Sequence, residues 1–381
     1  MLKEKLILVN YTGRRGGGSL DAYEITKSIL LCTPNIAAVV SEYVENLEMW
    51  KGLALKKLVV IPTYRNNKEF ITASLDFHKI KKKIRKELSE YEISYIYCPM
   101  VAMWSQKINR LFPSAHTYAV LHDPVPHSGD RVALASKLLE LFGFGISKKI
   151  YTDAEGIMVH SRRFLKYVED KFHKKGKVFY LPLGRHDFYK KIQGSEPVIK
   201  YDPSRCNFLF FGTISHYKGI GILLDAYSEI EKKYDNVSLT IAGNGDFEKY
   251  KQRCSRLKNV TVINRWIKDS EVESLFSGEN IIAVVPYLDA TQSGVVLVAM
   301  DYHVPVIATA TGGLVEQVED DVTGILVESG NTEALERAMI GLMNDECKRK
   351  ELVQNADNYL EEISWNKTAE KLLRIMGYPP S

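Results

Sequence analysis

The residues with the clearest chemical potential lie between Leu288 and Val327. Ser293 and Gly294 stand just before or at the start of an apolar stretch, Val295–Tyr302, whose pattern predicts a helix. Backbone N–H groups in the first turn of a helix have no partner inside the helix, and the helix dipole adds positive character there. These residues therefore predict a binding site for an anion such as a phosphate.

A short apolar run, Val304–Ala308, follows this helix and is rich in β-branched residues. Such a run is typical of a strand in a parallel sheet that is buried on both faces. A glycine pair, Gly312-Gly313, then predicts a turn. A phosphate site between the strands of a parallel sheet indicates a nucleotide bound at the carboxyl ends of those strands.

A second candidate for anion binding follows another apolar run, Asn207–Phe211. Gly212 permits a tight turn after this run, and Lys218 is predicted at the start of the next helix. A lysine beside unpaired helix N–H groups suits a diphosphate. The alternative is an ordinary surface lysine that precedes a helix.

Two further groups follow strand-like runs in the first half of the chain. Residues 13–18 form a glycine-rich turn that would let a ligand approach the backbone closely, although a simple strand-to-helix turn is the alternative. His122 and Asp123 come after the run Thr117–Leu121, with His127 close by. Because active sites in α/β proteins gather at the carboxyl ends of strands, His122 is a catalytic candidate, and a structural histidine is the alternative.

Together these segments resemble glycosyltransferase family 4, a GT-B family that transfers sugars from nucleotide-sugars. The matching residues are Ser293-Gly294, Ala299-Met300, Val304–Thr309, Gly312-Gly313, Glu316 and Thr323–Val327. The family usually has two glutamates eight positions apart here, one for the sugar and one for the nucleotide ribose. Ala290 and Val298 occupy those positions, and Gln292 is a substitute for the first glutamate only.

The resemblance implies roles for the candidate residues. The donor diphosphate would be bound by Gly17, Gly18, Gly212, Thr213, Lys218, Gln292, Ser293, Gly294 and Val295. Thr213 stands where the family usually has an arginine that works with the lysine. The nucleotide would lie against Gly243, Arg265, Trp266 and Ile267, although Trp266 as a core residue is an equal alternative.

The resemblance also implies roles on the acceptor side. His122 and Asp123 would lie near the transferred sugar as the catalytic pair. Arg14, Arg15, His127 and Glu316 are the remaining candidates, for the acceptor or its surroundings. Neither a metal site nor a bound cofactor is expected, because no Asp-x-Asp and no zinc-ligand spacing occurs, and the nucleotide-sugar is a substrate.

Alternating strand and helix patterns must position these residues. Strands are predicted at Leu6–Val9, Ala37–Val40, Lys57–Ile61, Ser94–Tyr97, Thr117–Leu121, Gly156–Val159, Asn207–Phe211, Ser238–Ala242, Val260–Ile263, Ile281–Val285 and Val304–Ala308. Ser19 or Asp21 is expected to cap the first helix, and another helix is expected to start near Ser161. The alternation predicts an α/β fold with parallel sheets, and the resemblance makes it GT-B, with two Rossmann-like domains facing each other across a cleft.

The length of 381 residues fits two domains. We expect an acceptor-binding domain at residues 1–185 and a domain that binds the nucleotide-sugar at residues 186–363. Residues 364–381 are expected to form a terminal helix, which the resemblance predicts to cross back to the first domain.

The net charge of +4 hides an asymmetry between the two halves. Residues 1–185 contain 30 Lys and Arg against 18 Asp and Glu, a balance of +12, whereas the remainder contains 21 against 29, a balance of −8. Phe77–Glu90 predicts a basic amphipathic helix with a stripe of Ile80, Ile84 and Leu88. This helix suits an anionic membrane surface, and a solvated helix that packs on its own domain is the alternative.

The remaining composition excludes several protein classes. The five cysteines are scattered without a C-x-x-C pair, which argues against a zinc site or a disulfide framework and fits a reducing cytoplasm. No run reaches the roughly 18 apolar residues that span a bilayer, and the apolar part of the N-terminus is too short for a signal peptide. A cytoplasmic location is expected, with peripheral association at the inner face of the membrane.

The sequence therefore predicts a metal-independent glycosyltransferase. It would move a sugar, with retention, from a nucleotide-diphosphate sugar to a lipid-linked or oligosaccharide acceptor in cell-surface polysaccharide or glycan assembly. Three alternatives stay open: a non-catalytic sugar-nucleotide-binding partner subunit, a GT-B sugar-nucleotide epimerase, and a nucleic-acid binder. Nucleic acid is not the expected partner, because charge alone supports it and leaves the phosphate-binding loops unexplained.

Overall fold

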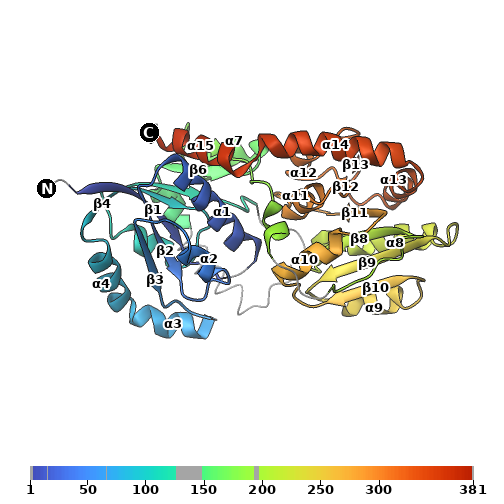
Figure 1. Cartoon of the computed structure of the whole chain (residues 1–381), viewed down its shortest axis with the longest axis horizontal. Helices are drawn as coiled ribbons and strands as arrows, with labels where there is room; N and C mark the ends of the chain where they lie inside the picture. The colour runs from blue at the N-terminus through green and yellow to red at the C-terminus, as the bar shows by residue number, and fades with distance from the viewer. Residues whose placement is uncertain (1–2, 15, 66, 126–147, 193–196, 380–381) are drawn as a thin grey trace. The chain divides into compact units, whose positions relative to one another are not determined.

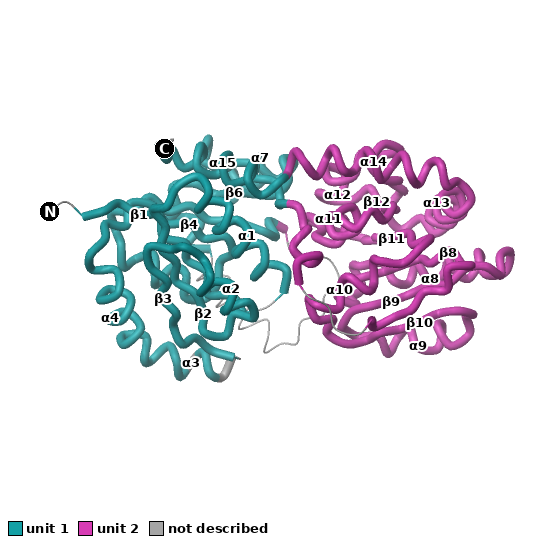
Figure 2. The backbone as a smooth tube through the Cα atoms, viewed as in Figure 1, with its two compact units in different colours: residues 1–124, 132–184, 364–381 teal, residues 125–131, 185–363 magenta. Residues whose placement is uncertain are grey.

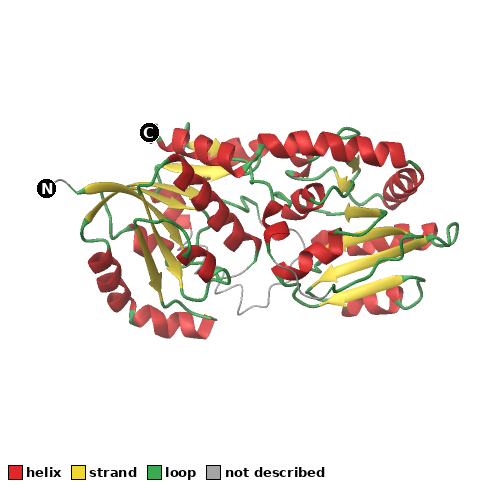
Figure 3. Cartoon of the chain, viewed as in Figure 1, coloured by secondary structure: helices red, strands yellow, loops and turns green. Residues whose placement is uncertain are grey.

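The computed structural model describes residues 3–14, 16–65, 67–125, 148–192 and 197–379. The chain forms two compact units, each built on its own parallel sheet (Figure 2). Unit 1 contains residues 1–124, 132–184 and 364–381, and unit 2 contains residues 125–131 and 185–363. Each unit alternates strands with helices, as expected of Rossmann-like domains (Figure 3).

Unit 1 contains a parallel sheet with the strand order β3-β2-β1-β4-β5-β6-β7. Figure 1 labels β1, β2, β3, β4 and β6 of this sheet. Its strands are β1 (Glu4–Tyr11), β2 (Ile36–Ser41), β3 (Lys57–Ile61), β4 (Tyr91–Cys98), β5 (His116–Val120), β6 (Gly156–Val159) and β7 (Val178–Tyr180). Its helices are α1 (Gly17–Cys32), α2 (Leu47–Lys51), α3 (Asn67–Leu75), α4 (Phe77–Glu87), α5 (Ser105–Asn109), α7 (Leu165–Phe172) and α15 (Trp365–Met376). The strand order reverses direction between β1 and β4, which places a topological switch point there.

Helix α4 packs its apolar stripe into the core of unit 1. Ile80, Ile84 and Leu88 are buried in the same cluster as the sheet residues Leu6 and Val39. The stripe is therefore covered by the unit's own sheet, and the part of α4 that is left for a membrane is its charge. The prediction that this amphipathic face meets a lipid surface is corrected on that point.

Helix α1 begins earlier than the sequence predicts. Its first residue is Gly17 and its N-cap is Gly16, with φ 88°, so neither Ser19 nor Asp21 is the cap. The Ser19 hydroxyl donates to the Gly16 carbonyl at 2.8 Å from inside the helix. A positive φ is easily adopted by glycine, and this explains why a glycine ends the loop.

Helix α15 belongs to unit 1 although it follows all of unit 2 in the sequence. It packs against α1, and the Tyr118 hydroxyl donates to the Met376 carbonyl at 3.3 Å. The ring of Trp365 fills the space beside Gly184, where an added Cβ would lie 2.4 Å from a ring carbon. Unit 1 is thus completed by the last helix of the chain.

Unit 2 contains a parallel sheet with the strand order β10-β9-β8-β11-β12-β13. Its strands are β8 (Cys206–Phe211), β9 (Val237–Gly243), β10 (Val260–Asn264), β11 (Ile281–Val285), β12 (Val306–Thr309) and β13 (Ile325–Val327). Its helices are α8 (Ile220–Ile230), α9 (Glu248–Cys254), α10 (Asp269–Phe276), α11 (Gly294–Asp301), α12 (Leu314–Gln317), α13 (Thr332–Asn344) and α14 (Glu346–Glu362). The switch point of this sheet lies between β8 and β11.

The predicted fold class is confirmed as two Rossmann-like α/β units with parallel sheets. Two strands were missed, β7 and β13, and each has only three residues. The strand predicted at Val304–Ala308 begins at Val306 instead, and a 3-10 turn at Arg162–Phe164 precedes α7 near Ser161. The facing arrangement of the two domains across a cleft stays a prediction.

Candidate functional site

The candidate anion-binding residues of unit 2 meet at its switch point. Strand β8 pairs in parallel with β11, and Ile281 lies opposite Asn207. The loop after β8 carries Gly212 and Lys218, while the loop after β11 leads to Ser293 and Gly294. Both loops leave the carboxyl edge of the sheet, which is where α/β proteins bind their ligands.

Backbone contacts hold these two loops together. The Leu288 N–H donates to the Tyr217 carbonyl at 2.7 Å. Gly219 has φ 71°, and a Cβ added there would lie 1.8 Å from the Pro286 carbonyl oxygen. Only glycine allows so close an approach, so residue 219 fixes the distance between the loops.

Lys218 lies in a short 3-10 turn, His216–Lys218, two residues before α8 begins. Its ammonium lies 3.6 Å from the ring centroid of Tyr287 and 5.0 Å from that of Tyr217. Among the described residues no carboxylate forms an ion pair with it. Its charge is therefore not offset by a carboxylate among these residues, which leaves the ammonium available to a bound anion.

The start of α11 is built as the sequence predicts, with one correction. Ser293 is the N-cap in an extended conformation, φ −142° and ψ 117°, and Gly294 is the first helical residue. The Ser293 N–H donates to the Gln317 carboxamide oxygen at 2.7 Å, so this amide is not available to a ligand. The first-turn amides of Gly294 and Val295 are left to bind an anion.

The surroundings of α11 explain why a glycine stands at 294. An added Cβ would lie 2.9 Å from Nε2 of His186, whose ring is buried beside this turn. The backbone N–H of His186 donates to the Asp301 carboxylate at 2.6 Å, which also pairs with Arg185 at 2.7 Å. This ion pair, whose carboxylate is buried, fixes His186 against the first turn of α11.

The other predicted donor residues surround the same turn. An added Cβ at Gly212 would lie 3.6 Å from Val295, and one at Gly243 would lie 1.9 Å from the Gly212 carbonyl, so the three residues are neighbours. Thr213 is exposed and Gln292 is half-buried. Their ligand roles stay predictions.

The two positions that replace the family's glutamates are apolar and buried. Ala290 and Val298 are each 2% exposed. The Ala290 carbonyl accepts from the Gly313 N–H at 3.2 Å, which ties the loop after β11 to the predicted glycine turn. Neither side chain can accept a hydrogen bond, and both pack in the interior of unit 2.

Arg265 is engaged within its own loop. Its guanidinium binds both carboxylate oxygens of Glu271, at 2.7 and 3.0 Å. Hydrogen bonding to Arg265 lowers the pKa of Glu271, which also accepts from the Lys268 N–H at 2.8 Å at the start of α10. Trp266 is 39% exposed, so the alternative that it is a core residue is wrong, while Ile267 is buried.

Glu316 lies in α12 and is half-buried, next to Gln317. The role given to Glu316 stays a prediction. Its neighbour Gln317 contacts Ser293, the N-cap of α11, through both the oxygen and the nitrogen of its carboxamide.

In unit 1, His122 follows β5 by two residues. Its Nε2 donates to the Pro99 carbonyl at 2.8 Å, and its ring lies 4.7 Å from that of His160. Burial lowers the pKa of His122, so the imidazole is neutral near pH 7 and Nδ1 can accept a proton. Asp123 is exposed, and His127 lies outside the described residues.

The glycine-rich turn of unit 1 is held in place by Arg14. Its guanidinium donates to the Tyr64 carbonyl at 3.1 Å and lies 5.5 Å from the centroid of that ring. Gly17 has open space at its Cβ position, whereas a Cβ at Gly18 would lie 2.2 Å from the Met100 methyl carbon. Arg15 lies outside the described residues.

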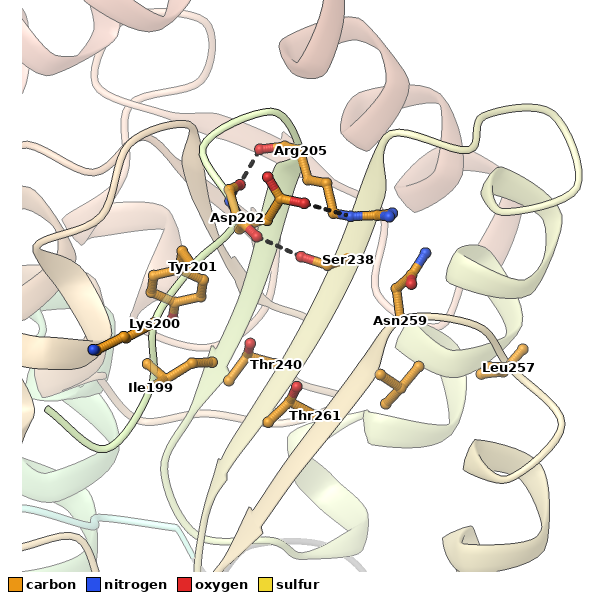
Figure 4. A pocket seen from close by; sticks show the side chains of 12 residues that line it. Ile199, Lys200, Tyr201, Asp202, Arg205, Ser238, Thr240, Leu257, Asn259 and Thr261 are labelled. Carbon is orange, nitrogen blue, oxygen red and sulfur yellow. Dashed lines mark hydrogen bonds and ion pairs between the residues drawn. The ribbon is translucent and has the colours of Figure 1, made fainter.

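A cavity of about 330 Å³ lies elsewhere in unit 2, at the amino ends of β8, β9 and β10 (Figure 4). Several of its polar side chains bind one another or the backbone. Arg205 pairs with Asp202 at 3.1 Å, the Tyr201 hydroxyl donates to the Leu275 carbonyl at 2.8 Å, and Ser238 donates to Asn207. The residues predicted to bind an anion lie at the other end of the strands, so this cavity is not the candidate site.

The switch-point residues of unit 2 lie within a segment that matches a known protein family. Residues 205–345 match the protein family Glycosyl transferases group 1. This group 1 segment contains Gly212, Lys218, Tyr287 and the start of α11. The broader prediction of a glycosyltransferase is therefore supported for unit 2, while the assignment to family 4 stays finer than the match.

Curated relatives agree with the group 1 match. An uncharacterized glycosyltransferase of Methanocaldococcus jannaschii is 28% identical over 171 residues, which are 44% of this chain and 43% of that protein. A phosphatidyl-myo-inositol mannosyltransferase of Mycobacterium leprae is 25% identical over 160 residues, 42% of each chain. The chain thus spans less than half the length of these two relatives.

A solved structure resembles the whole chain. The HepE protein of Anabaena, crystallised with UDP and glucose, superposes with a TM-score of 0.71 at 16% identity. The match covers 99% of this chain and 100% of that chain. At this identity the likeness shows the fold, which is that of GT-B glycosyltransferases.

Three residues at the switch point were not found from the sequence, namely His186, Tyr287 and Gln317. Tyr287 follows β11 by two residues, so its place at a strand end could have drawn attention to it. Gln317 reaches Ser293 across 24 residues, and His186 reaches Gly294 from outside the sheet. Contacts between residues so far apart in the sequence cannot be predicted from the spacing of residue types.

Among the described residues, no group of three or more His, Cys, Asp or Glu side chains is placed to hold a metal ion. In the same residues, no helix is both long and apolar enough to cross a bilayer.

Proposed function

We propose that this protein is a glycosyltransferase that moves a sugar from a nucleotide-diphosphate sugar to an acceptor. The observation that carries the proposal is Lys218, a half-buried cation at the switch point of the matched segment, which pairs with no carboxylate in the part of the chain that the structure describes. The first turn of α11 comes at the end of the loop after β11. It offers backbone amides and the positive end of a helix dipole. A diphosphate would satisfy both.

In this proposal the chemical work of unit 2 is electrostatic. Negative charge grows on the diphosphate as the bond to the sugar breaks, and donors placed in advance stabilise that charge without reorganising. Lys218 would supply the full charge, and the Gly294 and Val295 amides would supply partial charges. Thr213 leaves this chain without the second cation that the family resemblance implies. No metal is required by this arrangement, and retention follows the family rule.

For the acceptor we propose a lipid-linked molecule or an oligosaccharide in glycan assembly, bound by unit 1. The basic balance of residues 1–185 supports an anionic or lipid-linked acceptor. The Mycobacterium leprae relative is named for a phosphatidyl-myo-inositol acceptor, which is a membrane lipid. We place the enzyme in the cytoplasm, with charge-driven peripheral binding at the inner face of the membrane.

Nucleotide binding can be tested with UDP, GDP, dTDP and ADP in a thermal-shift assay. A ligand at 100 times its Kd stabilises the folded state by about 2.7 kcal/mol, which gives a clear rise in Tm. The nucleotide-sugar of the best binder would then be tested for turnover with and without lipid acceptors. If none of the four nucleotides raises Tm at millimolar concentration, the proposal is wrong.

A second candidate function is a non-catalytic subunit that binds nucleotide-sugars. The buried Ala290 and Val298 favour it, because the side chains that would bind sugar and ribose are absent at those positions. Such a protein would bind a nucleotide in the same assay but would neither hydrolyse nor transfer its sugar. An epimerase would convert the donor without any acceptor, and product analysis by NMR separates the three outcomes.

A further inference from the structure

Tyr287 occupies the centre of the anion-binding site without facing solvent. Its side chain is 0% exposed, although it stands at the carboxyl edge of the sheet, two residues after β11. Lys218 lies over its ring at 3.6 Å. A cation is attracted to the face of an aromatic ring, and the attraction strengthens when water is excluded.

The backbone of Tyr287 is fixed independently of that contact. Its carbonyl accepts from the Thr309 hydroxyl at 2.5 Å and from the Ser329 hydroxyl at 3.1 Å. The next residue, Leu288, donates to the Tyr217 carbonyl beside Lys218. The ring is thus a rigid platform, held by β12 and by the loop after β13.

The same side chain reaches the second anion-binding element. The Ser293 hydroxyl donates to the Tyr287 hydroxyl at 3.3 Å, and Ser293 is the N-cap of α11. On its other side, Ser293 is bound by Gln317 through both its N–H and its carbonyl. One tyrosine therefore touches both the cation and the helix start that would bind a diphosphate.

We propose that Tyr287 is the positioning residue of this site, holding the Lys218 ammonium over its ring and linking that ammonium to the start of α11. The inference rests on the proposed function and deepens it. A flexible lysine that is held by a ring needs no carboxylate to order it, so its charge stays available to the anion. The ring also orders the Lys218 side chain. This matters here because Thr213 stands where the family usually has an arginine that works with the lysine.

The affinity for UDP tests the proposal through a double-mutant cycle. Tyr287→Leu should weaken UDP binding by about 2- to 30-fold, the range for a cation–π contact that is progressively desolvated. In a Lys218→Met background the same substitution should have almost no further effect, because Tyr287 acts through Lys218. Tyr287→Phe keeps the ring and should retain most of the affinity.

A matched control is Tyr227→Leu, which also removes a tyrosine ring that is 0% exposed in unit 2. The Tyr227 hydroxyl donates to the Lys258 carbonyl, away from the switch point. This variant should lower Tm as Tyr287→Leu does, yet leave UDP affinity within twofold of wild type. Equal losses of affinity in both variants, or additive losses with Lys218→Met, would overturn the positioning role.

A second measurement works without any nucleotide. Lysines are labelled with ¹³C by reductive methylation, and the Lys218 signal is assigned from its loss in Lys218→Met. Ring current should shift this signal upfield in wild type and in Tyr287→Phe. Most of the shift should be lost in Tyr287→Leu, where only the Tyr217 ring remains, at 5.0 Å.

The two measurements separate this inference from the proposed function. A ring-current shift in a protein that binds none of UDP, GDP, dTDP or ADP would overturn the function but leave the Lys218–Tyr287 contact established. UDP binding without that shift, and without non-additivity in the cycle, would overturn the positioning role while the function stands.

Discussion

The Gln317 carboxamide binds both backbone groups of Ser293. Its oxygen accepts from the Ser293 N–H at 2.7 Å, and its nitrogen donates to the Ser293 carbonyl at 3.1 Å. All of these atoms belong to buried residues. The start of α11 is therefore held by a side chain from α12, and the direction of its first amides depends on that side chain.

Replacing Gln317 should disturb both stability and binding. Gln317→Leu leaves a buried N–H and a buried carbonyl without partners, which costs about 1–3 kcal/mol for each group. We expect a lower free energy of unfolding in urea and a weaker affinity for UDP. Gln317→Glu keeps the acceptor but loses the donor, so its stability should be intermediate. A Gln317→Leu variant with wild-type stability would show that the contact contributes nothing.

Lys218→Ala should slow turnover more than it weakens ground-state binding. A charge-assisted bond that strengthens as the diphosphate leaves is worth about 2–4 kcal/mol, or roughly 30- to 1000-fold in rate. The measurement is kcat and KM with the best donor. Lys249→Ala is the control, because the Lys249 ammonium also lies over a tyrosine ring, 5.0 Å from the centroid of Tyr250, but belongs to α9 and not to the loops after β8 and β11. Turnover of Lys218→Ala within threefold of wild type contradicts the assignment.

His122 should affect catalysis with little effect on nucleotide affinity. We expect His122→Ala to lower turnover strongly while the Kd for UDP stays close to wild type. His122→Gln retains a donor for the Pro99 carbonyl and so separates the structural hydrogen bond from the imidazole. Full turnover in His122→Ala, with only a lower Tm, would assign His122 a purely structural role.

The same histidine predicts how stability depends on pH. Burial lowers the pKa of His122, so between the folded value and the ordinary value of about 6.5 the unfolded chain binds more protons than the folded chain. Stability should therefore fall as pH drops below about 6.5, until pH passes the lower pKa of the folded state. Urea unfolding at a series of pH values should show a shallower fall for His122→Gln. Parallel curves would mean that His122 titrates alike in both states.

Helix α4 should bind anionic vesicles through charge alone. Lys81, Lys82 and Lys86 are exposed, whereas the apolar stripe is buried in unit 1. Each basic residue near an anionic surface contributes about 1 kcal/mol, screened over about 8 Å at physiological salt. Reversal of these three lysines to Glu should weaken co-sedimentation with anionic vesicles, and high salt should release the wild type.

The control reverses three exposed lysines of unit 2, Lys200, Lys249 and Lys258, which changes net charge by the same amount. This variant should keep its vesicle binding if α4 is the contact. Equal binding of wild type to neutral and anionic vesicles would instead show that α4 is only a solvated surface. The nucleotide affinity of both triple variants should match that of wild type.

Most helices and strands were predictable because the pattern of apolar and polar residues in each segment indicates which of its faces is buried. The run Ile281–Val285 is apolar throughout and forms β11, and the predicted terminal helix matches α15 at Trp365–Met376. Strand β13 was missed because three residues give no periodicity to detect, and its pairing with β12 decides its structure. The cap of α1 was misplaced because Gly16 has no side chain to signal a cap, while Ser19 does.

The candidate site was predictable where chemistry follows a strand and hidden where it depends on packing. The positions of Lys218 and Ser293 after strands followed from the glycine and strand patterns that precede them, and their ligand roles stay predictions. Whether a guanidinium is available depends on the fold, and Arg265 is bound to Glu271 at 2.7 Å. The contacts of Tyr287 and Gln317 arise from long-range packing, which pairs residues that no short motif connects.

The place of α15 in unit 1 has a consequence for synthesis of the chain. The N-terminal part of a chain leaves the ribosome first, and domains generally fold as units during synthesis. Most of unit 1 is synthesised before residues 185–363 of unit 2, yet its fold then still lacks the helix that packs on α1 and the ring that lies beside Gly184. We expect unit 1 to be completed only after α15 has been synthesised, so that the surface of α1 that α15 covers stays exposed until then.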